Sequence, residues 1–252
     1  MKPYFTDGTV ELYHGDFREV VPDLQYAFDL VIADPPYGET SHDWDIWPTG
    51  WPAFIADYTQ AMWCFGSFRT LTDHAVEIWP YWNLSQDFVW EKHNGTGFAT
   101  DRFKRVHELA VHCYRGSWGE IYHDTPRVPA TAKRGGPGGM LHRYKQIAHT
   151  GQIAESSYAD DGLRLARSVA KHPSVRGGIH PTEKPVRILE DFIHYGCPLT
   201  GVVLDPFAGS GSTLEAARRL GRRAIGVEAR EEQCEKTANR LSQGVLDFGE
   251  VS

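Results

Sequence analysis

The chain has 252 residues, of which 41% are hydrophobic, 23% charged and 12% aromatic, and its formal net charge is −7. This length fits one large α/β domain or two small ones, and it suffices for a buried core. No run of about 18 apolar residues occurs, which argues against a transmembrane helix. The first residues lack the apolar core of a signal peptide, so we expect a cytoplasmic protein. Four widely spaced cysteines, Cys64, Cys113, Cys197 and Cys234, predict reduced thiols and neither a disulfide framework nor a zinc site.

Charge is distributed unevenly along the chain. Residues 1–60 hold two basic residues against eleven acidic ones, whereas residues 102–149 hold nine basic residues against three acidic ones, a local balance of +6. A basic segment on an acidic scaffold is typical of a surface that binds a polyanion. A solvated basic surface without a ligand would show the same charge, so charge alone leaves both interpretations open.

The first readable strand is the apolar run Phe28–Ala33, which suits a strand covered on both faces. It ends at Asp34-Pro-Pro-Tyr37, where two prolines prevent the strand from continuing. Residues 51–64 are compatible with a helix that overlaps a predicted strand near Ala61–Phe65. Residues 92–170 lack clear periodicity, and the glycine-rich run 134–139 inside them predicts a loop.

A second α/β unit begins near residue 180. The pattern predicts a helix over 186–195, a strand over 201–205, a helix over 212–220, a strand over 223–228 and a helix over 231–241. A glycine-rich turn, Pro206-Phe-Ala-Gly-Ser-Gly211, separates the first strand from its helix. This succession, in which the second strand ends in an acid, is typical of one half of a nucleotide-binding α/β fold.

The glycine-rich turn predicts a ligand site. Gly209 and Gly211 allow the backbone to approach a ligand, and the free N–H groups at the start of the next helix favour an anionic group. The turn lacks the lysine of a P-loop and the extended pattern of a dinucleotide site, which disfavours ATP and dinucleotides. Glu228, at the end of the next strand, is placed to accept hydrogen bonds from ribose hydroxyls. An adenosine-type ligand is therefore favoured over a purely structural turn.

Asp34-Pro-Pro-Tyr37 has the groups needed to grip a planar amine. The Asp34 carboxylate and the Pro35 carbonyl can each accept one N–H of an exocyclic amino group, and the Tyr37 ring can stack on the base. Taken alone, the tetrapeptide fits a structural turn with a packed tyrosine better than a catalytic site.

Three motifs that occur in a fixed order favour the catalytic interpretation of this tetrapeptide. Asp34-Pro-Pro-Tyr37, then His180-Pro-Thr-Glu-Lys-Pro185, then Asp205-Pro-Phe-Ala-Gly-Ser-Gly211 resemble the β-class amino-methyltransferases of DNA, with further matches at Tyr13–Asp16, Trp90–Lys92 and Arg105–Glu108. The resemblance implies an α/β fold with a doubly wound, mainly parallel sheet of the S-adenosylmethionine-dependent methyltransferase type, permuted in motif order. Residues 1–91 would form the catalytic half, 92–175 an inserted target recognition region and 176–252 the cofactor-binding half.

The resemblance also implies residue roles. The catalytic residues would be Asp34, Pro35, Pro36 and Tyr37. S-adenosylmethionine would contact Asp16, Asp34, His180, Thr182, Lys184, Asp205, Phe207, Gly209, Ser210, Gly211, Ser212, Thr213 and Glu228. Among these, Glu228 would bind the ribose, Asp16 the adenine, Asp205 the methionine ammonium, and Lys184 would close the methionine end. DNA would contact Arg102, Lys104, Arg105, Lys133, Arg134, Arg143 and Lys145. The transfer needs no metal, and we expect none.

The function implied is methylation of adenine N6 in double-stranded DNA by base flipping, since aspartate in place of serine at position 34 is typical of the adenine enzymes. The alternatives are methylation of cytosine N4, methylation of adenine in RNA, and an inactive cofactor-binding subunit that recognises DNA. A separate cognate restriction endonuclease is a further expected partner. A homodimer is also compatible with the sequence, in which case the tryptophan-rich stretch Trp44–Trp51 would suit the interface, although it could equally pack locally.

Overall fold

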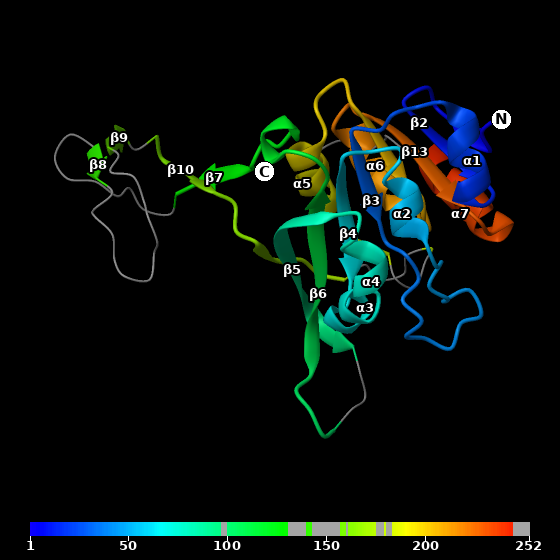
Figure 1. Ribbon diagram of the computed structural model, residues 1–252, viewed down its shortest axis with the longest axis horizontal. Coiled ribbons are helices and arrows are strands. Elements are labelled where there is room, and N and C mark those ends of the chain that lie inside the picture. The colour runs from blue at the N-terminus through cyan, green and yellow to red at the C-terminus, as the bar shows by residue number, and fades with distance from the viewer. Residues whose placement is uncertain are drawn as a thin grey trace. The chain divides into compact units, whose positions relative to one another are not determined.

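The computed structural model in Figure 1 describes residues 1–96, 100–130, 140–142, 157–159, 161–174, 179 and 183–243. The chain forms two compact units. The first comprises Met1–Asp124 with Ser168–Ser252, and the second comprises Thr125–Arg167. Among the described residues, none of the helices is both long enough and apolar enough to cross a membrane.

A nine-stranded sheet organises the first unit, in the order β1-β2-β13-β12-β3-β4-β6-β5-β11. Its strands are β1 (Phe5–Thr6), β2 (Val10–His14), β3 (Leu30–Ala33), β4 (Ala61–Gly66), β5 (Asn83–Thr96), β6 (Arg105–Tyr114), β11 (Val169–Lys171), β12 (Val202–Asp205) and β13 (Arg223–Glu228). The run from β2 to β4 is parallel throughout. β6 continues the sheet antiparallel to β4, and β5 pairs antiparallel with β6.

Helices cover both faces of this sheet, as expected for a doubly wound fold (Figure 1). They are α1 (Phe17–Leu24), α2 (Trp51–Ile55), α3 (Phe68–Asp73), α4 (Ala75–Ile78), α5 (Val186–Gly196), α6 (Ser212–Arg219) and α7 (Glu231–Ser242). Side chains of α5, α6 and α7 share one buried cluster with one face of the sheet, and side chains of α1 to α4 share a second cluster with the other face.

The central strand β3 shows why helices must pack on both faces of the sheet. All its residues are buried, and alternate side chains enter opposite clusters: Leu30 and Ile32 face α5, whereas Val31 and Ala33 face α1 and α2. The predicted strands over 28–33, 201–205 and 223–228 are therefore confirmed with small changes at their ends. The predicted helices over 186–195, 212–220 and 231–241 are confirmed as α5, α6 and α7.

The predicted helix over 51–64 is wrong beyond Ile55. Residues 56–58 form a turn, and Thr59 forms an isolated bridge with Phe28. Ala61–Gly66 form β4, which is buried along its whole length between β3 and β6 and confirms the strand predicted near Ala61–Phe65. Six consecutive buried residues satisfy their backbone groups in the centre of a sheet, and tertiary pairing outweighs any local helical preference here.

Residues 92–124 also differ from the expectation of an unpatterned segment. β5 and β6 form a long antiparallel pair that continues the main sheet. The pattern was not readable because β6 changes from exposed at Arg105 to buried at Val111, so no single alternation describes it. The second unit, within the predicted recognition region, holds the pairs β7 (Arg127–Pro129) with β10 (Leu163–Leu165) and β8 (Met140–His142) with β9 (Ser157–Ala159). Recognition of the target by residues 92–175 stays a prediction.

Within the stretch Trp44–Trp51, the tryptophans at positions 47 and 51 pack locally, whereas Ile46 is 71% exposed. Trp47 is 9% exposed and Trp51 is fully buried. The Trp47 ring stacks on His74 with a centroid distance of 3.8 Å, and its Nε1 donates a hydrogen bond to Glu77 Oε1 at 3.1 Å. The four cysteines are free thiols and all are buried.

Phe192 provides a test of this packing. Its ring stacks on Trp63 at a centroid distance of 4.0 Å, and the residue is 2% exposed between α5 and the sheet. We expect Phe192→Ala to lower the free energy of unfolding by about 3–5 kcal/mol, because it leaves a cavity in the core. Leu199→Ala, at a position that is 72% exposed, is the control and should change it by less than about 0.5 kcal/mol. Denaturant unfolding measures both, and equal losses would contradict the assignment.

Candidate functional site

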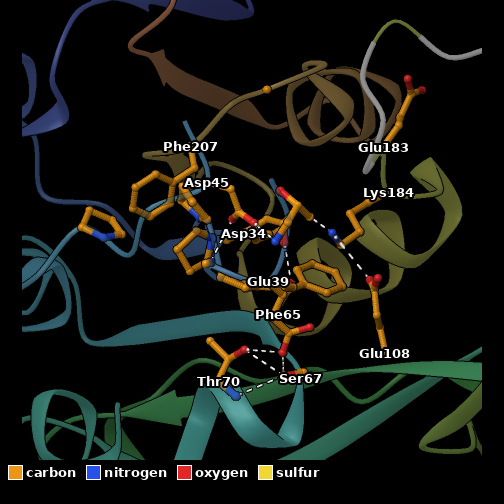
Figure 2. Close-up of a pocket in the computed structure, with 18 of the residues that line it drawn as sticks. Asp34, Glu39, Asp45, Phe65, Ser67, Thr70, Glu108, Glu183, Lys184 and Phe207 are labelled. Atoms are coloured by element: carbon orange, nitrogen blue, oxygen red, sulfur yellow. Dashed lines mark hydrogen bonds and ion pairs between the residues drawn. The ribbon is translucent and has the colours of Figure 1, made fainter. Parts of the chain in front are cut away.

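A cleft of about 1310 Å³ opens at the carboxyl ends of the parallel strands. Its walls come from the segments that follow β2, β3, β4, β12 and β13, together with residues near the start of β6. Because parallel strands end at one edge of the sheet, the chain ends that follow them converge there, and ligands of open α/β sheets bind at this edge. Figure 2 shows the side chains that meet inside it.

Asp34 stands directly after β3, at the base of the cleft. Its Oδ1 accepts a hydrogen bond from the Tyr37 hydroxyl at 2.7 Å, and its Oδ2 accepts one from Lys184 Nζ at 2.5 Å. The Asp34 side chain is 25% exposed, whereas that of Lys184 is 6% exposed. The prolines turn the chain out of the sheet, and the two donors fix the carboxylate in one orientation while leaving lone pairs for a further donor.

Lys184 also joins Asp34 to the β5–β6 pair. Its Nζ lies 3.6 Å from Glu108 Oε2 on β6, and Glu108 Oε1 accepts a short hydrogen bond from Lys92 on β5. The Lys184 ammonium sits 5.0 Å from the centre of the Phe65 ring. Figure 2 shows this ammonium between the two carboxylates. One chain of contacts therefore extends from the cleft into the β5–β6 pair, through Tyr37, Asp34, Lys184, Glu108 and Lys92.

Burial and charge act in opposite directions on this chain of groups. Burial raises the pKa of the Asp34 carboxyl, and the Lys184 charge offsets only part of this effect. Burial would lower the pKa of Lys184, but the Asp34 and Glu108 charges outweigh it and raise that pKa. Burial also acts to raise the pKa of Glu108, yet Lys184 and Lys92 outweigh it and lower that pKa. Lys184 consequently stays protonated and Glu108 ionised near neutral pH.

The loop after Tyr37 is fixed by two carboxylates. Asp45 accepts hydrogen bonds from the backbone N–H groups of Gly38 and Thr40, at 2.9 and 2.7 Å. Glu39 Oε1 accepts a hydrogen bond from the Ser67 hydroxyl at 2.5 Å, and its Oε2 accepts one from Arg105 at 3.2 Å. Glu39 thus connects the loop to the start of α3 and to the start of β6, as Figure 2 shows in part.

The glycine-rich turn is held in place by α7. The Gly209 carbonyl accepts hydrogen bonds from the Thr237 hydroxyl at 2.6 Å and from Gln233 Nε2 at 3.1 Å. Gly211 has φ +75°, and a Cβ at this position would lie 2.6 Å from Thr237 Cγ2. Glycine is therefore required there by backbone conformation and by the approach of α7.

Arg240 of α7 secures the other side of this turn. It donates hydrogen bonds to Glu183 at 2.7 Å, to the Ser210 carbonyl at 3.2 Å and to Glu215 at 2.6 Å. Glu183 immediately precedes Lys184. The same arginine therefore fixes the turn and the segment that carries the ammonium partner of Asp34.

Two acids end β12 and β13 beside the turn. Asp205 is 4% exposed, its Oδ1 accepts a hydrogen bond from the Phe207 N–H at 3.0 Å, and among the described residues it forms no ion pair. Burial raises the pKa of Asp205 to about 7, the Asp34 and Glu228 charges add to this, and hydrogen bonds from Thr213 and Phe207 oppose it. Glu228 Oε2 accepts a hydrogen bond from the Gly209 N–H at 3.0 Å, and its Oε1 accepts two from Arg230.

The structure brings most of the predicted site residues together. The cleft is lined by Asp16, Asp34, Pro35, Pro36, Tyr37, Lys184, Asp205, Phe207, Gly209, Ser210, Ser212, Thr213 and Glu228, and Gly211 lies behind them against α7. Arg102, Lys104 and Arg105 line the same cleft. His180, Thr182, Lys133, Arg134, Arg143 and Lys145 lie outside the described residues. Among the described residues, no group of three or more histidines, cysteines or acids could hold a metal ion.

Sequence reasoning assigned no role to Glu108, Lys92 or Arg240. The first two belong to short matches that were noted without a function, and their importance arises from the antiparallel register that places Trp90 opposite Glu108. The sequence does not predict that register, and it therefore does not show that Lys92 and Glu108 are neighbours. Arg240 is one of two cations on the amphipathic helix α7, and no sequence signal separates it from the exposed Lys236.

The family model N6_N4_Mtase, described as DNA methylase, matches residues 28–240. The chain is 42% identical to the Type II methyltransferase M2.DpnII of Streptococcus pneumoniae, over 95% of this chain and 92% of that protein. It is 40% identical to the Type II methyltransferase M2.LlaDCHI of Lactococcus lactis subsp. cremoris, over 96% of this chain and 93% of that protein.

Two solved structures are similar in fold. The complex of M1.HpyAVI with SAM has a TM-score of 0.63 at 21% identity and covers 92% of this chain and 99% of its own. The cytosine-N4-specific PvuII DNA methyltransferase has a TM-score of 0.61 at 16% identity and covers 100% of this chain and 91% of its own. At these identities the likeness establishes the fold of this chain and not its target.

Removing the Lys184 charge tests the buried network. Lys184→Met leaves Asp34 and Glu108 without their shared cation, so we expect it to lower the free energy of unfolding by about 3 kcal/mol at pH 8. Burial already raises the pKa of the Asp34 carboxyl, and without the cation that pKa rises further above its unfolded value, so the folded variant binds more protons than its unfolded state. The loss should therefore shrink as the pH falls from 8 to 5.

The matched control is Lys236→Met, because Lys236 pairs with Glu232 at 2.6 Å on the exposed surface of α7. This pair should contribute less than about 1 kcal/mol. Denaturant unfolding at several pH values measures both variants. A Lys184→Met protein as stable as the control variant at pH 8 would contradict the network.

Proposed function

The chain belongs to the DNA methylase family N6_N4_Mtase, and from this premise we propose that it methylates adenine N6 in double-stranded DNA with S-adenosylmethionine as the methyl donor. The observation that carries the proposal is the Asp34-Pro-Pro-Tyr37 segment, whose carboxylate is held at the base of a cleft that also contains the glycine-rich turn. The same cleft thus offers a place for the target base and a place for the cofactor.

The cofactor half of the cleft fits an adenosine carrying a charged amino-acid tail. Asp205 is a buried carboxylate that forms no ion pair among the described residues, which suits the ammonium of the methionine portion. Phe207 offers an aromatic surface on the wall of the cleft. Glu228 Oε1 already accepts two hydrogen bonds from Arg230, whereas its Oε2 accepts one from the Gly209 N–H and keeps a second lone pair for a ribose hydroxyl.

The other half of the cleft fits an exocyclic amine. Asp34 can accept one amino hydrogen and the Pro35 carbonyl the other, which holds the nitrogen lone pair toward the glycine-rich turn. S-adenosylmethionine supplies an activated methyl group when it is bound. The amine nitrogen would gain the methyl carbon as the bond between that carbon and the sulfonium sulfur breaks and leaves a thioether. The nitrogen must then release one proton, and the Asp34 carboxylate, whose pKa burial raises, is suited to receive it.

Lys184 acts in this proposal mainly on Asp34. Its ammonium holds Oδ2, and the Tyr37 hydroxyl holds Oδ1, so the carboxylate keeps one orientation before a base enters. Such preorganisation removes the need to order the group during the reaction. The predicted contact of Lys184 with the methionine end of the cofactor remains a second role for the same side chain.

DNA is the substrate that family membership implies, and the cations Arg102, Lys104 and Arg105 at the cleft suit its phosphates. The choice of adenine over cytosine depends on aspartate at position 34, as in the adenine enzymes that the chain resembles. A homodimer and a separate cognate endonuclease remain predictions.

The decisive experiment is incubation of the purified protein with unmethylated genomic DNA and labelled S-adenosylmethionine, followed by nucleoside analysis. We expect N6-methyladenine. Asp34→Asn should reduce turnover by about 100- to 10,000-fold while cofactor affinity changes by no more than a few-fold, because it alters the target half of the cleft. Asp23→Asn, on the exposed side of α1, is the control and should keep full activity.

Other outcomes of this experiment are equally informative. N4-methylcytosine would overturn the choice of base and keep the mechanism. Label in RNA alone would overturn DNA as the substrate, and cofactor binding without any transfer would indicate an inactive recognition subunit. An Asp34→Asn protein with normal rates would contradict the assigned role of the carboxylate.

The raised pKa of Asp205 predicts that the affinity for the cofactor depends on pH. Its pKa of about 7 means that the carboxyl is largely protonated below pH 7, and an ammonium bound beside it favours the ionised form. Binding below pH 7 therefore releases a proton, and affinity should fall by up to about tenfold per unit as the pH decreases from 7 to 5.5. Titration calorimetry with S-adenosylmethionine measures this slope.

The variant Asp205→Asn should bind more weakly and lose the slope. Asp191→Asn is the control, because burial also raises the pKa of Asp191 but this residue lies on α5 outside the cleft. It should keep the slope of the parent protein. A flat profile for the parent protein would place the ammonium elsewhere.

A further inference from the structure

Phe103 is the most exposed large apolar side chain of the described residues, at 101% exposure, and it lies two residues before β6. It lines the same cleft as Asp34. Leaving a phenylalanine ring wholly in water forgoes about 1.5–3 kcal/mol of burial free energy, so such a ring at a cleft mouth suggests that a partner covers it.

The neighbours of Phe103 identify the chemistry of that partner. Arg102 precedes it, Lys104 follows it, and Arg105 begins β6. Arg102 forms a surface ion pair with the adjacent Asp101, and the two side chains are 65% and 66% exposed. Surface pairs of this kind contribute little and exchange readily for another anion. An apolar ring set among cations matches a duplex, whose base stack is apolar and whose backbone is anionic.

The position of Phe103 relative to Asp34 is fixed by the hairpin. The β5–β6 pair extends from Asn83 opposite Tyr114 to Thr96 opposite Arg105, with shifts of register between Leu84 and Gln86 and between Glu91 and Thr96. Near the cleft, Glu108 of β6 faces the Lys184 ammonium that holds Asp34, and Arg105 is tied to Glu39 at 3.2 Å. Arg105 and Glu108 are three residues, or about 10 Å, apart along a strand. The strand β6 therefore leads from the amine site to the residue two positions after the exposed ring.

We infer that Phe103 is a wedge that enters the base stack of duplex DNA and occupies the space left by the base that moves into the cleft. This inference rests on the proposed function and adds a positioning residue to it. Taking a base out of the stack costs a few kcal/mol, and an apolar side chain inserted between base steps offsets part of that cost. Single-stranded DNA has no paired stack to enter, so the wedge matters only for a duplex.

Transfer rates on two forms of one substrate test the wedge. Methyl incorporation is measured on unmethylated genomic DNA, either native or heat-denatured, for the parent protein and for Phe103→Ala, Phe103→Trp and Leu199→Ala. We expect Phe103→Ala to lose at least about tenfold on native DNA, corresponding to about 1.4 kcal/mol, and less than twofold on denatured DNA. Phe103→Trp should retain the duplex rate, and Leu199→Ala should match the parent on both.

Equal losses of Phe103→Ala on native and denatured DNA would overturn the wedge, and so would an unchanged duplex rate. Phe68 is also at the cleft and is 76% exposed. A duplex-specific loss in Phe68→Ala and not in Phe103→Ala would assign the wedge to α3 and overturn the inference.

A binding measurement separates failure of the wedge from failure of the proposed function. A duplex containing one abasic site already has the space that the ring would fill. The parent protein should bind it at least about fivefold more tightly than the intact duplex, and Phe103→Ala should lose this preference. Absence of label in every parent reaction would contradict the proposed function, and the binding preference would then decide the wedge alone. Equal preference in the parent and in Phe103→Ala would overturn it.

Discussion

The ion pair between Asp34 and Lys184 is the constraint on which the site depends. These residues are 150 positions apart in the chain, yet their charged atoms lie 2.5 Å apart at the carboxyl edge of the sheet. A lysine that is 6% exposed needs carboxylates around it, and its charge in turn offsets part of the effect of burial on the Asp34 carboxyl. The pair therefore holds the segment that leaves β3 against the segment that enters α5, and both halves of the chain must fold before either charge is satisfied.

Further side-chain contacts connect that ion pair to the other walls of the cleft. Arg240 connects the residue before Lys184 to the glycine-rich turn. Gln233 and Thr237 donate hydrogen bonds to a backbone carbonyl of the same turn. Glu108 connects Lys184 to the β5–β6 hairpin. Each step is a charged or hydrogen-bonded contact between elements that the two apolar clusters already position, so the site adds little flexibility of its own.

The parallel part of the fold was predictable because its signals are local. The apolar run of β3, the Pro-Pro exit and the glycine-rich turn each reflect one backbone requirement that a short segment shows by itself. Asp34, Asp205 and Glu228 were found for the same reason, since each follows a readable strand. The β5–β6 pair and its residues Lys92 and Glu108 were not assigned, because their pattern changes along the strand and depends on a register between distant residues. The helix expected over 51–64 failed where β4 became the centre of the sheet.

The acids of the cleft divide it chemically, because their surroundings differ. Asp34 has a buried ammonium on one oxygen and a phenol on the other, so it is oriented and partly neutralised before any ligand binds. Asp205 is more deeply buried and receives only neutral donors, and burial raises its pKa to about 7. A neutral amine suits the first environment, since no further cation is needed there. A cationic group suits the second environment, because a nearby positive charge favours the ionised carboxylate that burial disfavours. In the proposed function, the order of these two carboxylates along the edge would therefore decide which end of the cleft takes the uncharged amine and which takes the positively charged group.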